Sequence, residues 1–126
     1  MYPRRFAVTP VSASDGSVIA YTDVGVTGAL RSIQYVKAGA ANYADGVDFA
    51  ITSETTGQGL WTEANVNASA IRCPRQATHD SVGVALLYAG GGAAVTDFIY
   101  LAGERVKISI TNAGDTKTGT FYITVG

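Results

Sequence analysis

The sequence predicts an all-β fold, an antiparallel β-sandwich or a partly open β-barrel of about seven to nine strands. Apolar and polar residues alternate with a period of two in several short runs. Glycine-containing segments separate these runs at intervals of about 8 to 15 residues, as turns do in antiparallel sheets. No stretch carries capped, amphipathic apolar spacing over two helical turns, so we expect almost no helix.

Three runs show the alternation most clearly: VDFAITS at 47–53, RVKISIT at 105–111 and TFYITV at 120–125. Because successive side chains of a strand point to opposite faces, each run has one apolar face and one polar face. The last two runs are separated by NAGDTKTG, whose Asn, Asp and Gly residues favour turns. We therefore expect a C-terminal β-hairpin with a long loop. Further expected elements are a short helical turn near Ala40–Tyr43 and strands at Val18–Thr22, Ile33–Lys37, Leu60–Ala64, Val84–Ala89 and Asp97–Ala102.

The chain has the length and composition of one domain, with 126 residues and a hydrophobic content of 47%. No linker, low-complexity tail or internal repeat divides it, so we expect a single β domain at 1–126, with 1–16 as an extended N-terminal arm. The first residues, MYPRRFAVTPVSAS, hold no apolar run of signal-peptide length. A single cysteine cannot form an internal disulfide, so we expect synthesis in a reducing cytoplasm.

The charge balance excludes two classes of partner. The net charge is −1, which provides no broad attraction to nucleic acid or to an anionic membrane. No run approaches the roughly 18 apolar residues of a membrane span. Only 15% of the residues are charged, so Thr, Ser, Asn, Gly and Ala must cover much of the surface. Such a surface is easily desolvated, which suits burial against other proteins.

The single cysteine and the single histidine both fall within RCPRQATHDS at 72–81. Cys73 precedes a proline and has no helix start beside it that would lower its pKa. His79 and Asp80 lack a GxSxG segment that would supply a serine nucleophile. One histidine and one cysteine cannot form a zinc cluster. We therefore expect a loop without catalytic residues, metal or cofactor, in which Arg72 and Arg75 pair with carboxylates of a neighbour.

Two other features suggest ligands. Gly90-Gly91-Gly92 lacks the Lys-Ser/Thr pair and the helix N-terminus of a phosphate-binding loop, so we interpret it as a connection between strands. Trp61, together with the seven tyrosines, is compatible with a sugar-binding platform. A glycan-binding β module requires Trp61 to be exposed in a groove with polar neighbours.

Four segments carry a resemblance to a known family: DGVDFAITSETTG at 45–57, NVNASAIRCPRQATHD at 65–80, LLYAGGGAAVTD at 86–97 and RVKISITNAGDTKTGTF at 105–121. They resemble small structural proteins encoded among the virion morphogenesis genes of tailed bacteriophages and prophages. The resemblance covers about two thirds of the chain, and the first 44 residues lie outside it. It implies a component of the virion, made in the cytoplasm of the bacterial host, and brings no catalytic residues.

The composition and the resemblance together lead us to expect a capsid decoration or cement protein that stabilises the major capsid lattice. A head–tail joining (neck) protein or a tail component is the alternative within the virion, and a glycan-binding β module is the alternative of another class. The expected partners are the major capsid protein or other virion proteins, and further copies of the chain in a homo-oligomer, with no membrane and no specific nucleic acid. The residues expected at the interface are Tyr2, Arg4, Arg5, Phe6, Arg72 and Arg75.

Overall fold

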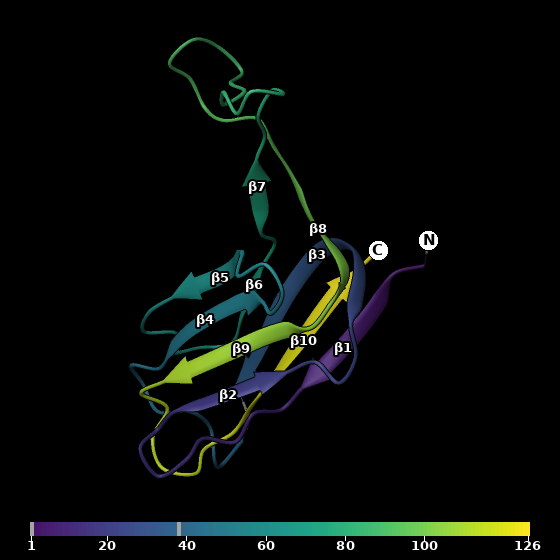
Figure 1. Ribbon diagram of the computed structural model, residues 1–126. Helices are drawn as coiled ribbons and strands as arrows, with labels where there is room; N and C mark the ends of the chain where they lie inside the picture. Colours follow the sequence, from purple (N-terminus) through teal and green to yellow (C-terminus); the bar gives the residue numbers. More distant parts are fainter. Residues whose placement is uncertain (1, 38) are drawn as a thin grey trace.

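The computed structural model describes residues 2–37 and 39–126, and these residues form two antiparallel β-sheets with no helix and no closed barrel (Figure 1). The predicted all-β, sandwich-type fold is confirmed. The strands in chain order are β1 (Arg4–Val8), β2 (Val18–Tyr21), β3 (Val26–Lys37), β4 (Asp48–Ser53), β5 (Gly59–Glu63), β6 (Ala70–Arg72), β7 (Arg75–Ala77), β8 (Thr96–Glu104), β9 (Val106–Thr111) and β10 (Gly119–Val125).

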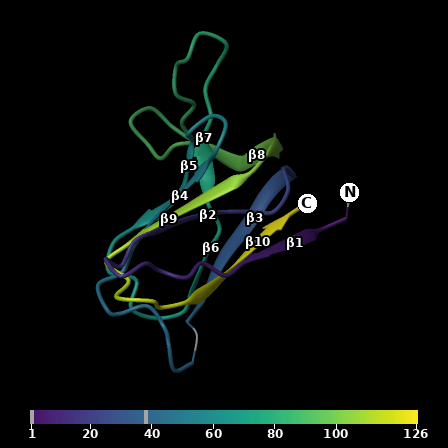
Figure 2. The same ribbon diagram turned by 60° about the horizontal axis from the view of Figure 1, so that its bottom comes forward.

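The larger sheet has six strands in the order β1-β10-β3-β8-β7, with β6 also beside β3, and the smaller sheet has four in the order β2-β9-β4-β5. One edge of β3 is shared, because residues 26–30 pair with β8 and residues 33–35 pair with β6. Residues 96–98 of β8 pair instead with β7, and this two-stranded ribbon leads away from the sandwich (Figures 1 and 2). The structure therefore has more strands than the sequence predicted, because β6 and β7 are too short to show an alternating pattern.

The alternating runs bury their apolar faces between the two sheets. In β4, β9 and β10 every second residue is buried, as the sequence predicted. An aromatic cluster occupies one end of this core: Phe49 of β4 packs edge-on against Tyr35 and Phe121, with ring centroids 4.9 Å apart in both pairs. Burial raises the pKa of Tyr43, whose hydroxyl donates a 2.7 Å hydrogen bond to the carbonyl of Pro10. The N-terminal segment is thereby attached to the core.

Gly119, the first residue of β10, is a glycine because of these rings. A Cβ atom at this position would lie 2.7 Å from the Tyr43 ring and 2.8 Å from the Tyr35 ring. Both rings are buried and stacked on each other with centroids 5.9 Å apart, so neither can move aside easily. The close approach of backbone and rings sets how tightly β10 closes this end of the sandwich.

The C-terminal hairpin predicted from the sequence is wrong. β9 pairs with β2 and β4 in the smaller sheet, whereas β10 pairs with β1 and β3 in the larger one. The connecting loop carries positive φ angles at Asn112, Gly114 and Thr116, and it crosses from one sheet to the other. The alternation of each strand is the same in a hairpin and in an arch across the core, because both place one face toward apolar residues.

Three further expectations also change. Val84–Ala89 forms no strand, and only isolated bridges occur there, because no neighbouring strand of the sandwich covers this run. Within the expected N-terminal arm, residues Arg4–Val8 form an edge strand on β10, while Met1 lies outside the described residues. The expected helical turn at Ala40–Tyr43 contains a turn without helix. Among residues 2–37 and 39–126, no helix has the length and hydropathy needed to cross a membrane.

The close packing around Gly119 leads to a stability prediction. Gly119→Ala should lower the free energy of unfolding by about 1–3 kcal/mol, because the added methyl group overpacks the two tyrosine rings. Gly59→Ala in β5 is the matched control, since a Cβ there meets nothing within 4 Å. Chemical denaturation of the three proteins measures both effects. Equal stabilities of the two variants would contradict this account of the core.

Candidate interaction surface

The part of the molecule that lies outside the sandwich is a forked arm, defined here as residues 78–95. It continues from the ribbon of β7 and β8 and ends in two loops, which stand clear of both sheets in Figures 1 and 2. Three segments meet at its centre through backbone hydrogen bonds of 2.9–3.0 Å. The N–H of Leu86 donates to the carbonyl of Thr78, and the N–H of Val95 donates to the carbonyl of Leu86. The N–H of Thr78 in turn donates to the carbonyl of Val95. These bonds give the arm a defined backbone without a core of its own.

The first loop of the forked arm is a turn built on Asp80. Its carboxylate oxygen Oδ1 accepts hydrogen bonds from the backbone N–H groups of Val84 at 3.0 Å and Val82 at 2.9 Å. These two bonds hold the pKa of Asp80 below its ordinary value. Gly83 completes the turn with a φ of +86°, a conformation that side-chain-bearing residues rarely adopt. Asp80 is therefore a structural residue of the turn.

The second loop turns at the three consecutive glycines. The N–H of Gly92 donates to the carbonyl of Ala89 at 2.8 Å, and the N–H of Tyr88 donates to the carbonyl of Ala93 at 3.0 Å. Gly91 has a φ of +71°. The glycines thus form a tight connection, but the expectation that they join two strands is wrong, because residues 78–95, between β7 and β8, form no strand.

The forked arm presents apolar side chains to solvent. Val82 is 81% exposed, Tyr88 76% and Val84 60%, while Leu86 and Leu87 are each 42% exposed. No charged residue occurs from 81 to 96. Several large apolar side chains exposed on one segment are typical of interaction sites in folded proteins. These residues do not stand out in the sequence as a surface, because a run of apolar residues predicts a buried strand.

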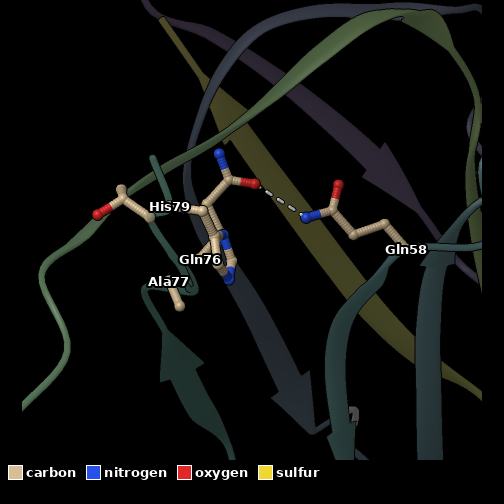
Figure 3. Close-up of a pocket in the computed structure, with 5 residues that line it drawn as sticks. Gln58, Gln76, Ala77 and His79 are labelled. Carbon is tan, nitrogen blue, oxygen red and sulfur yellow. Dashed lines mark hydrogen bonds between the residues drawn. The ribbon is translucent and has the colours of Figure 1, made fainter. Parts of the chain in front are cut away.

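An open cleft of about 620 Å³ lies at the base of the forked arm, between β7 and the turn that precedes β5 (Figure 3). Gln58 donates from Nε2 to Oε1 of Gln76 at 3.0 Å, which ties the ribbon to the smaller sheet. His79 also lines the cleft and is exposed, and no serine oxygen lies within hydrogen-bonding distance of its ring among the described residues. Cys73 is exposed as well.

Arg72, one of the predicted interface residues, makes its contacts inside the molecule. Its guanidinium binds Glu63 through two hydrogen bonds, Nε to Oε1 at 2.9 Å and Nη2 to Oε2 at 3.0 Å. Glu63 also accepts a 3.0 Å hydrogen bond from the indole N–H of Trp61. The Arg72 hydrogen bond, followed by that of Trp61, lowers the pKa of Glu63. Because β6 belongs to the larger sheet and β5 to the smaller one, this ion pair joins the two sheets along one edge.

The other predicted interface residues lie on the larger sheet or beside it. Arg75 stacks on the ring of Phe98 at 4.0 Å, and Arg5 stacks on the ring of Tyr122 at 3.7 Å. Arg4 is exposed, with its guanidinium 5.2 Å from the centre of the Phe6 ring. Phe6 itself is half-buried against the core, and Tyr2 is 87% exposed. The structure thus brings Arg4, Arg5 and Phe6 together on β1 and places Arg75 on the far strand of the same sheet.

The residues that bear on ligand binding are Trp61 for a glycan, and His, Cys, Asp and Glu side chains for a metal ion. Trp61 is 6% exposed and packs against Phe49, so it does not form the exposed platform that a glycan-binding module requires at this position. Among residues 2–37 and 39–126, no group of three or more His, Cys, Asp or Glu side chains is placed to hold a metal ion.

Comparison with known proteins gives little further information. No family model matches the chain, and no curated protein matches it significantly. Among solved structures, the chain is similar to the crystal structure of FlhE, with a TM-score of 0.46 and 9% sequence identity, over 98% of this chain and 96% of that one. A likeness of this degree carries no functional inference for the present chain.

The turn at Asp80 leads to a pH prediction. A carboxylate with a lowered pKa stabilises the folded turn above its unfolded pKa, and this stabilisation is lost as the pH falls through the folded value. The amide NMR signals of Val82 and Val84 should therefore titrate together, with a midpoint below the ordinary aspartate value of about 3.9. In Asp80→Asn this titration should disappear. A midpoint at or above the ordinary value would contradict the turn geometry.

The ion pair of Arg72 leads to a second prediction. Arg72→Ala and Glu63→Gln should each lower the free energy of unfolding, and a double-mutant cycle should give a favourable coupling energy, as expected for a partly exposed bidentate pair. Denaturation of the wild type, the two single variants and the double variant measures the coupling. Strictly additive effects would show that the pair does not join the sheets.

Proposed function

We propose that this chain is a structural protein of a tailed-phage virion, and that it attaches to neighbouring subunits through the forked arm. The observation that carries the proposal is the exposed apolar surface of the arm at residues 81–95, which hold no charged side chain and lie outside the hydrophobic core. Burying this surface against the sandwich is not needed for folding, since the core is complete without it. Exposure of this apolar surface to water is therefore unfavourable in free energy, and contact with another protein removes that unfavourable term.

The backbone of the forked arm is arranged for binding before a partner arrives. The hydrogen bonds at its centre and in both loops fix the segments that carry Val82, Val84 and Tyr88. A preorganised segment loses less conformational entropy on binding than a disordered one, so more of the apolar contact energy appears as affinity. Support for a virion in particular comes from the resemblance of the segments between 45 and 121 to phage morphogenesis proteins.

Within the virion, we propose the role of a capsid decoration protein that binds the mature lattice of the major capsid protein. A protein that binds only the mature lattice adds its binding energy to that state and stabilises it by mass action. A ring-forming neck or tail component is the second candidate, because small β-sandwich subunits with arms also suit closed rings. The copy number separates the two roles: hundreds of copies per particle indicate decoration, and about six or twelve indicate a ring.

The proposal is tested by changing the forked arm without changing the sandwich. Val82→Ser combined with Tyr88→Ser should reduce incorporation into particles by at least about tenfold, since two exposed apolar contacts are removed from the interface. Ile19→Ser is the matched control, because Ile19 is 56% exposed on β2 and lies outside the arm. Densitometry of purified particles against the major capsid protein measures both incorporation and copy number. Incorporation of the arm variant at the wild-type level would exclude the arm as the attachment site.

A further inference from the structure

The larger sheet carries four arginines whose guanidinium groups lie on aromatic rings. Arg5 lies over Tyr122 at 3.7 Å, Arg75 and Arg31 lie over Phe98 at 4.0 and 4.5 Å, and Arg4 lies 5.2 Å from the Phe6 ring. In the described part of the chain, no Asp or Glu side chain lies within ion-pair distance of any of them. By contrast, Lys37, Arg72 and Arg105 each pair with a carboxylate of the same chain, Asp45, Glu63 and Glu54 respectively.

The strand register gathers these arginines at one end of the sheet. Arg4 of β1 is opposite Val125 of β10, Val125 is opposite Leu30 of β3, and Leu30 is opposite Ile99 of β8. Arg31 follows Leu30, and Arg75 is opposite Phe98, which precedes Ile99. Arg5, Arg31 and Arg75 therefore form a band across the outer face of the sheet, at the end where the base of the forked arm lies (Figure 1), whereas Arg4 is on the core-facing side of β1 together with Phe6. We call Arg5, Arg31 and Arg75 the arginine band.

The arginine band retains the capacity to bind carboxylates. Stacking on a ring orients the planar guanidinium and leaves its edges, where the N–H donors lie, available for a planar acceptor. Arg31 uses Nε and Nη2 on the carbonyl of Gly126, and Arg75 uses Nη1 on backbone carbonyls next to it. Asp97 lies beside the band, where its Oδ1 accepts a 2.7 Å hydrogen bond from the N–H of Phe98. One acidic neighbour against three arginines leaves the band electropositive.

The opposite end of the sandwich is acidic. Three loops, at 12–17, 44–48 and 112–118, interlock there: the Ala113 N–H donates to the Gly16 carbonyl at 2.9 Å, and the Ala44 N–H donates to the Ala113 carbonyl at 2.9 Å. Within these loops, Lys117 is the one cation. Lys37 reaches the group from β3 and pairs with one of its carboxylates. The acidic loop end, as we name this group, carries Asp15, Asp45, Asp48 and Asp115.

We infer that copies of this chain associate head to tail, with the arginine band of one copy against the acidic loop end of the next. The two ends carry opposite charge, and they belong to the same molecule. A nucleic acid is less favoured as the occupant of the band. The chain has ten carboxylates against nine cationic side chains, so the phosphates of a nucleic acid would be repelled by the rest of the protein surface. Because the chain itself carries an end of complementary charge, a second copy of the chain is the favoured occupant of the band.

A contact between two different patches is heterologous, so it generates a closed ring when the rotation between copies closes and a filament when it does not. The base of the forked arm lies at the same end as the arginine band, so the arm of each copy extends toward the copy that the band contacts. The inference is independent of the proposed role in a virion, because it concerns the purified chain alone. Failure of incorporation into particles and failure of self-association are therefore distinguishable.

A charge-exchange experiment tests the contact. The first variant combines Arg5→Glu with Arg75→Glu, and the second combines Asp15→Lys with Asp115→Lys. Sedimentation velocity at low and high salt measures the association of the wild type, of each variant alone and of an equimolar mixture. The wild type should associate at low salt and dissociate at high salt, and each variant alone should associate at least about tenfold more weakly. Lys107→Glu, a charge reversal on the smaller sheet, should associate like the wild type.

The equimolar mixture gives the decisive result. It should regain association, because one variant keeps a wild-type acidic loop end, the other keeps a wild-type arginine band, and the two reversed ends attract each other. Circular dichroism shows whether each variant is folded. A wild type that stays monomeric at low salt, variants that associate like the wild type, or a mixture that stays monomeric would each overturn the inference. A monomeric wild type whose arginine variant alone loses affinity for an oligothymidylate would assign the band to nucleic acid instead.

Discussion

The packing of Phe49 against Tyr35 and Phe121 is the contact on which the rest of the structure depends. Phe49 comes from the smaller sheet and the other two rings from the larger one, so this cluster fixes the distance and the rotation between the layers. The backbone at Gly119 fits against the same rings only because it lacks a side chain. With the layers fixed in this way, β8 begins in the ribbon with β7 and then passes along the larger sheet beside β3. The forked arm is therefore positioned by the core, yet contributes nothing to it.

Much of the fold could be predicted from the sequence, because alternation in β4, β9 and β10 reports directly which residues face a core. The pairing of the strands could not, since NAGDTKTG has turn chemistry whether it closes a hairpin or crosses between sheets. The forked arm was missed for a related reason. A run of apolar residues from 84 to 89 has the composition of a buried strand, and only the absence of a covering strand makes it a surface. Its lack of charge and the three glycines beside it are the features that set it apart.

The arginines show how far a sequence can identify an interface. Arg72 and Arg75 are three residues apart and have the same chemistry, but one is held by Glu63 and the other by an aromatic ring. The difference arises from strand pairing, because β6 lies next to the smaller sheet's edge, where Glu63 is available, and β7 lies opposite Phe98. A sequence predicts that arginines are present on a surface. Which of them retain free donors is decided by the register of the strands.

Arg75 has two roles that its variants will not separate by themselves. Together with Arg31 it covers Phe98 at the base of the forked arm, so removing it loosens the ribbon that carries the arm as well as the arginine band. Arg5 has no such connection, because it lies on β1, at the opposite edge of the sheet, over Tyr122. An effect shared by variants at Arg5 and Arg75 must then come from their charge. An effect confined to Arg75 must come from the arm, and the two surfaces can be distinguished in the assembled state on this basis.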